Sequence, residues 1–108
     1  MNSDPRAIFN QFDKLFSHAP ECPNGYAILA ECLALAEMLI EKNIAYGDSA
    51  LQPVRVFARD IDPTAQILVR LDDKLSRLAR GSDAGEDVVR DLLGYLILYR
   101  LAVAKKTP

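Results

Sequence analysis

Apolar residues recur at intervals of three and four along most of this chain, and this spacing limits the possible folds more than any other feature. It is the repeat of one face of an α-helix. A strand would need apolar and polar residues in strict alternation, and no segment sustains that pattern. The sequence therefore predicts an all-α fold, a small bundle of about four to five helices with short connections.

Start and stop signals place the helices along the chain. Asp4-Pro5 and Asp62-Pro63 each join a capping residue to a proline that suits the first helical position. Gly81 is suited to end a helix, because glycine readily adopts the left-handed conformation. We expect helices over about 5–17, 25–45, 63–80 and 84–104, the last capped by Ser82 or Asp83, and a short helix opened by Pro53.

Length and composition favour one domain over residues 1–108, with an N-terminal helix and loop at 1–24 and a core bundle at 25–104. The chain is half hydrophobic, with a formal charge of −2, which gives no general attraction to nucleic acid. It shows no signal-peptide pattern and no apolar run of transmembrane length. We therefore expect a cytoplasmic protein without a membrane partner.

Two acidic pairs are candidates for metal binding. Glu37 and Glu41 are four residues apart, as are Asp87 and Asp91, so each pair shares a helix face. If the two faces meet, four carboxylates converge, and magnesium or manganese would neutralise them. The alternative is that both pairs are ordinary solvated acids. The two cysteines, Cys22 and Cys32, are too few for a zinc site, and we interpret them as reduced thiols, with Cys32 in the core.

A basic stripe lies on the helix predicted over 63–80. Arg70, Lys74 and Arg77 follow one another at spacings of four and three, so they are neighbours on one face. They could hold the phosphates of a ligand. They could equally pair with Asp72, Asp73 or the acids of the last helix, and spacing alone leaves both interpretations open.

Two apolar surfaces need a partner. Beyond Asp91, the helix over 84–104 is apolar nearly all round, so it must be covered on every side. We expect a homo-dimer or homo-tetramer formed through this helix. The first helix carries a stripe that we interpret as a docking face onto the bundle: Ile8, Phe9, Phe12, Leu15 and Phe16. We expect the C-terminal Lys105-Lys106 pair to be a solvated helix end.

Three blocks of sequence point to a family. They read EKNxxYGDSxL over 41–51, RxDDKLxRL over 70–78 and EDVVxDLxGYLIL over 86–98. Together they resemble the nucleotide modification associated domain family of the first type, whose members are small proteins found largely in phages and bacteria. That family is in turn similar to the all-α nucleoside triphosphate pyrophosphohydrolases, the MazG-like and dimeric dUTPase-like enzymes.

The resemblance implies a MazG-like fold and a function on nucleotides. The related enzymes use magnesium to cleave a nucleoside triphosphate into a monophosphate and pyrophosphate. By this resemblance Glu41 and Asp91 would be the catalytic acids. The metal ligands would be Glu37, Glu41, Asp87 and Asp91, the pocket would be lined by Asn43, Tyr46, Asp48 and Ser49, and the phosphates would be held by Arg70, Lys74 and Arg77.

The acidic spacing departs from the enzyme pattern at two points. Glu37 and Glu41 are four apart where the enzymes have glutamates three apart. Val88 stands three positions before Asp91, where the enzymes carry an acid. Two alternatives therefore stay open beside the enzyme: a non-catalytic protein that binds or sequesters a nucleotide or signalling nucleotide, and a helical oligomerisation module.

Overall fold

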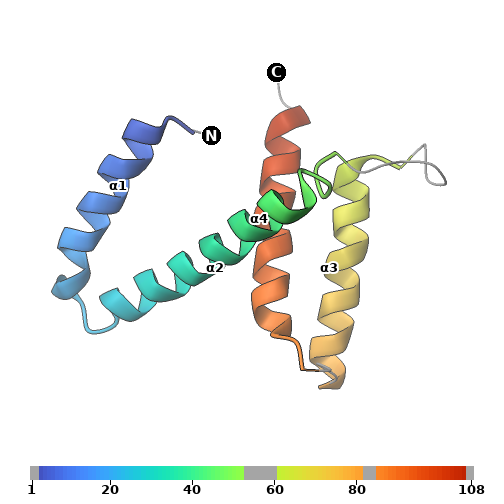
Figure 1. Ribbon diagram of the computed structural model, residues 1–108. Coiled ribbons are helices and arrows are strands. Elements are labelled where there is room, and N and C mark those ends of the chain that lie inside the picture. Colours follow the sequence, from blue (N-terminus) through green and yellow to red (C-terminus); the bar gives the residue numbers. More distant parts are fainter. Residues whose placement is uncertain (1–2, 53–60, 82–84, 107–108) are drawn as a thin grey trace. The chain divides into compact units, whose positions relative to one another are not determined.

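The computed structural model describes residues 3–52, 61–81 and 85–106 (Figure 1). These ranges contain helices and no strand, which confirms the predicted all-α class. The short helix predicted from Pro53 lies outside the described residues. The helices are α1 (Pro5–His18), the 3-10 helix η1 (Ala19–Glu21), α2 (Gly25–Tyr46), α3 (Pro63–Arg80) and α4 (Val88–Lys106).

The chain divides into two compact units, Met1–Met38 and Leu39–Pro108. The first unit contains α1, η1 and the beginning of α2, and the second contains the end of α2 together with α3 and α4. None of the helices in the described ranges combines the length and apolarity that crossing a bilayer requires.

The starts of α1 and α3 follow from the predicted capping signals. The Asp4 carboxylate accepts a hydrogen bond of 3.0 Å from the backbone N–H of Arg6. The Asp62 carboxylate accepts one of 3.1 Å from the N–H of Ala65. Each bond satisfies a donor that the first turn of a helix leaves without an intrahelical partner. Gly81 ends α3 in the left-handed conformation, with φ of 68°, as its sequence position predicted.

The predicted start of α4 is wrong. We expected the helix from about residue 84 with a cap at 82–83, but it begins at Val88. Gly85 has a φ of 83°, which no helical residue adopts. Asp87 then acts as the capping residue, because its Oδ1 accepts a hydrogen bond of 2.9 Å from the N–H of Arg90. At the other end, α4 continues to Lys106, two residues beyond the prediction.

In the first unit, a close approach between η1 and α2 fixes the turn. A Cβ on Gly25 would lie 1.8 Å from the carbonyl oxygen of Ala19, so this position accepts only glycine without a backbone shift. Close to this turn the rings of Phe16 and Tyr26 make an edge-to-face contact, with centroids 5.8 Å apart. Cys32 is exposed, so the prediction that it lies in the core is wrong.

In the second unit, α3 and α4 run side by side in opposite directions and pack against each other (Figure 1). Their buried residues are few and of small or medium size: Thr64, Ile67, Val88, Gly94 and Ala102. No large side chain among the described residues is fully buried. Apolar residues of α4 such as Leu93 and Leu96 remain more than two-fifths exposed, at 46% and 43%.

Candidate functional site

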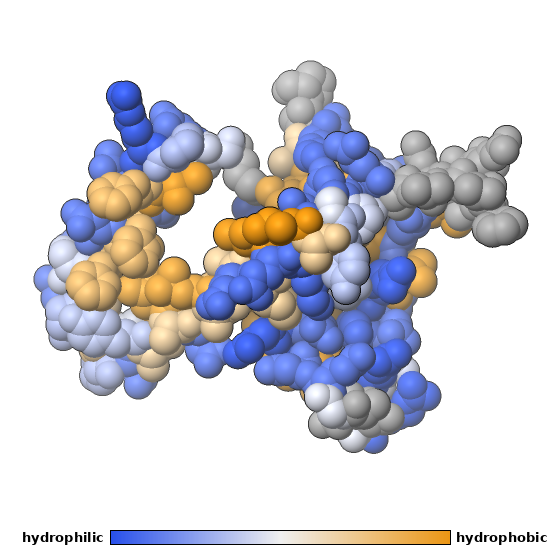
Figure 2. Space-filling view, in the orientation of Figure 1, coloured by the Kyte–Doolittle hydropathy of each residue, from blue (hydrophilic) through white to orange (hydrophobic). Residues whose placement is uncertain are grey.

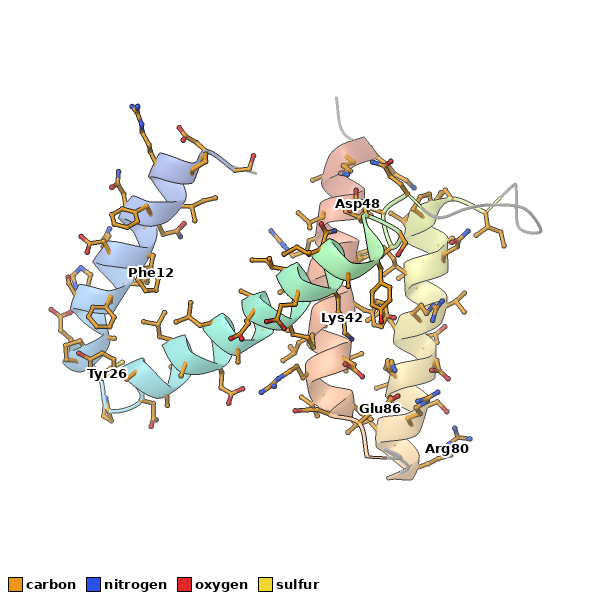
Figure 3. The ribbon with its side chains drawn as sticks, in the orientation of Figure 1. Phe12, Tyr26, Lys42, Asp48, Arg80 and Glu86 are labelled. Carbon is orange, nitrogen blue, oxygen red and sulfur yellow. The ribbon has the colours of Figure 1, made fainter. Side chains whose placement is uncertain are left out.

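The three blocks that carry the family resemblance meet in the second unit. The first block includes the end of α2, the second lies on α3, and the third contains the start of α4. Lys42 lies on the last turns of α2, and Glu86 lies just before α4 begins (Figure 3). Charged side chains from all three blocks contact one another here, and these contacts define the candidate site.

Asp91 is the centre of these contacts. Its Oδ2 lies 3.5 Å from the Nζ of Lys74 on α3, and its Oδ1 lies 4.0 Å from the Nζ of Lys42 on α2. The side chains of Lys74 and Asp91 are only 13% and 17% exposed, whereas that of Lys42 is 58% exposed. The pair between Lys74 and Asp91 is therefore the best shielded ion pair of the site. Shielding strengthens the attraction but also raises the cost of leaving either charge alone.

Glu86 extends the contacts along α3. Its Oε2 lies 3.3 Å from the Nζ of Lys74 and 3.1 Å from Nη1 of Arg77. Arg77 also pairs through Nε with Asp73, one turn away on the same helix, at 3.3 Å. We call this set the Lys74 network: Lys42, Asp73, Lys74, Arg77, Glu86 and Asp91.

The Lys74 network bears on the two interpretations of the basic stripe. Lys74 and Arg77 pair with Asp73 and with acids at the start of α4, as the structural interpretation expected. Arg70 is exposed on the same helix. Lys42 was not among the predicted site residues. Its place in the first block, beside Glu41, was the signal that could have identified it.

A hollow opens beside the Lys74 network, at the end of α3 and the start of α4. Its volume is about 220 Å³. Charged and apolar residues both line it: Arg77, Leu78, Gly81, Glu86, Asp87, Val88 and Val89. Arg77 and Glu86 belong to both the hollow and the network, so a ligand in the hollow would touch the paired charges directly.

A second polar cluster surrounds Asp48, just after α2 ends. Its Oδ1 accepts a hydrogen bond of 3.2 Å from Asn43, and its Oδ2 accepts one of 3.4 Å from Gln52. Lys105, near the end of α4, donates to the same Oδ2 at 3.3 Å. The structure thus brings together Asn43 and Asp48, two of the four predicted pocket residues. The other two, Tyr46 and Ser49, are exposed.

Lys106 holds the start of α3 in a similar way. Its Nζ lies 2.9 Å from Oδ2 of Asp62 and 2.6 Å from the hydroxyl of Thr64. The Thr64 hydroxyl donates a hydrogen bond to the Asp62 carboxylate. This bond is the largest cause, and the bond from Lys106 the second largest, that holds the pKa of the Asp62 carboxyl well below its usual range. Lys105 and Lys106 stay more than half exposed in the last turn of α4, as predicted for a solvated helix end, and each also pairs with an acid elsewhere in the unit.

The four predicted metal ligands occupy different settings. Asp91 is paired with lysines, and Asp87 caps α4 while its Oδ2 lies 3.8 Å from Nε of Arg90. Glu41 is exposed on α2, and Glu37 belongs to the first unit. Within the described ranges, no three side chains of His, Cys, Asp or Glu gather closely enough to hold a metal ion.

The surroundings of Asp91 do not suit magnesium. The ion takes several oxygen ligands in octahedral geometry, and its charge is repelled by cations. Asp91 instead has an ammonium group within 4.0 Å of each of its oxygens. A magnesium-dependent role for these acids therefore stays a prediction.

Comparisons with protein-family models, with curated proteins and with solved structures found no match for this chain. The family resemblance therefore rests on the three sequence blocks alone.

Proposed function

We propose that this protein binds nucleotides through the Lys74 network and the hollow beside it. One observation carries the proposal. The three sequence blocks that resemble a nucleotide-associated family place Lys42, Lys74 and Arg77 around two acids, at distances of 3.1 to 4.0 Å. Cations held in this way are pre-positioned for phosphate, which makes the same kind of charge-assisted hydrogen bonds as a carboxylate.

When a nucleotide binds, its phosphate oxygens replace a carboxylate as the hydrogen-bond acceptors of the cations. Phosphate oxygens replace Glu86 at Lys74 and Arg77, since Glu86 lies before the first turn of α4 and its side chain is 47% exposed. Arg77 offers a planar guanidinium suited to two phosphate oxygens, and Lys74 acts as a point charge. Arg70, one turn before Lys74 on α3, supplies a further cation. The amide of Asn43 and the carboxylate of Asp48 serve as polar contacts for the sugar or base.

Hydrolysis is the second candidate function. The family resemblance favours magnesium-dependent cleavage of a nucleoside triphosphate to monophosphate and pyrophosphate, with Glu41 and Asp91 as catalytic acids. The partly buried position of Asp91, where all three blocks meet, is the observation that favours this activity. The lysines beside Asp91 favour binding without turnover.

We also propose that the protein is a homo-dimer or homo-tetramer that associates through α4. Val89, Leu93 and Val103 of this helix are 50%, 46% and 41% exposed. Large apolar side chains at such exposure favour a partner surface. Association through α4 leaves the charged contacts of the Lys74 network in place.

Calorimetric titration with a panel of ribo- and deoxyribonucleoside triphosphates tests the proposal. We expect the Lys74→Met variant to bind at least tenfold more weakly than the wild type, because a central phosphate contact is lost. Lys14→Met removes an exposed lysine of α1, in the other unit, and serves as the matched control with unchanged affinity. A folded wild-type protein that binds none of the nucleotides would overturn the proposal.

The Asp91→Asn variant separates binding from hydrolysis. If the cations alone hold the nucleotide, removing a competing carboxylate strengthens binding several-fold, with or without a chelator. If Asp91 is a metal ligand, the same variant loses magnesium-dependent binding and the release of pyrophosphate. Pyrophosphate release by the wild type in magnesium, and its absence in chelator, would establish the enzyme.

A further inference from the structure

A second surface, in the first unit, has no part in the proposed nucleotide site. Apolar side chains gather along α1 and the beginning of α2 (Figure 2). On α1 they follow the helical repeat and so share one face. On both helices they are between 38% and 68% exposed: Ile8, Phe9, Phe12, Leu15 and Phe16 on α1, and Tyr26 and Leu33 on α2. We call this set the N-terminal apolar face.

The geometry of the turn keeps this face open. The tight contact between Gly25 and Ala19 fixes where α2 leaves η1. Phe16 stacks on Phe12, with ring centroids 6.2 Å apart, and reaches Tyr26 across the turn. Figure 3 shows Phe12 near the middle of α1 and Tyr26 beside the turn, at the start of α2. Further from the turn, Phe9 is 68% exposed.

The area of the face decides what can cover it. An aromatic side chain buries about 150–250 Å² when fully covered. At half exposure each aromatic residue therefore leaves roughly 100 Å², and the aliphatic ones somewhat less. The seven residues together leave roughly 600 Å² for a partner, or about 1,200 Å² when two such faces meet, which reaches the lower end of the range of about 1,200–2,000 Å² for stable specific interfaces.

We propose that the N-terminal apolar face is a self-association surface whose partner is the same face of a second copy of this chain. A two-fold pair suits it, because an isologous interface needs a single patch that meets itself. Two helices from each copy then surround one shared apolar core. This interface is separate from the α4 association proposed above and does not depend on nucleotide binding.

The test uses the full-length chain in sedimentation velocity and multi-angle light scattering. Phe9→Asp places a charge at the most exposed aromatic position of the face. We expect it to halve the assembly mass, or to raise the dissociation constant of the pair at least tenfold. Asn10→Asp adds the same charge one residue along, at a position of α1 outside the apolar face, and should leave the mass unchanged.

Three outcomes overturn the proposal. Wild-type protein that is monomeric at tens of micromolar has no such pair. Equal masses for the wild type and Phe9→Asp place the association elsewhere, for example on α4. A Phe9→Asp variant that melts at lower temperature with the same mass shows that the face packs within its own chain. Should Phe9→Asp lose its helical circular dichroism, the milder Phe9→Ser variant takes its place in the same comparison.

Discussion

The ion pair between Lys74 and Asp91 gives the sharpest test of how the second unit is held together. Lys74→Met removes the charge and keeps the apolar stem of the side chain, and Asp91→Asn keeps the shape and removes the charge. The two single variants and the double variant form a cycle that isolates the coupling free energy between the two side chains. Comparing one variant with the wild type would not isolate this coupling, because Lys74 and Asp91 each have other partners.

The expected magnitude follows from burial. Exposed ion pairs contribute about 0.2–1 kcal/mol, and breaking a fully buried pair costs about 3–5 kcal/mol. The side chains of Lys74 and Asp91 are 13% and 17% exposed, and each keeps a second partner, Glu86 or Lys42, when the other is removed. We therefore expect a coupling free energy of about 1.5 kcal/mol, between these limits.

Chemical denaturation followed by circular dichroism measures the cycle, at two protein concentrations so that any contribution from assembly is visible. Asp73 and Arg77 provide the control pair, because their side chains are 52% and 35% exposed and lie one turn apart on α3. That pair should couple by about 0.3–0.5 kcal/mol. A Lys74–Asp91 coupling no larger than the control would refute the claim that this contact is a shielded structural pair.

Two further predictions concern Asp62 and Gly25. The depressed pKa of Asp62 contributes stability above the carboxyl's unfolded pKa of about 3.9 and loses it as pH falls. The unfolding free energies of the wild type and Asp62→Asn should therefore differ by a constant amount from pH 5 to 8 and converge below about pH 4; a constant difference down to pH 2 would contradict this cause. Gly25→Ala brings its Cβ against the Ala19 carbonyl, so we expect a glutamate-specific protease to cleave after Glu21 several-fold faster. Gly81→Ala strains the left-handed end of α3 without a clash and lies in the other unit, so it is the control and should leave that rate unchanged.

Helix positions could be predicted from the sequence wherever one capping signal stood alone. Asp4-Pro5 and Asp62-Pro63 each offered a single solution, and the helices begin where those motifs place them. The start of α4 could not be fixed, because several capping residues follow one another from 82 to 87. The φ of 83° at Gly85 decides between them, and neither spacing nor composition reveals a backbone angle.

The candidate site could be predicted as a set of residues but not as a set of contacts. The blocks containing Lys74 and Asp91 were identified as neighbours in function, and the two side chains do meet. Whether Asp91 faces other acids or lysines depends on how α4 is rotated about its own axis. A spacing of four residues shows that two side chains share a face, but not what that face meets. Lys105 was missed for a related reason. Its partner Asp48 is 57 residues away in sequence, and no local pattern links them.

The balance of charge in the Lys74 network bears on how a ligand would enter. Three cations face three carboxylates, so the network has no excess positive charge to attract a phosphate. An incoming phosphate must therefore displace one of the carboxylates. Asp91 is held in the first turn of α4 and is 17% exposed, so moving it disturbs the packing of that helix. Glu86 lies outside the helix and is 47% exposed, and its displacement leaves α4 capped by Asp87. In the proposed function Glu86 is therefore the acid that gives way, and the hollow that it lines is the point of entry.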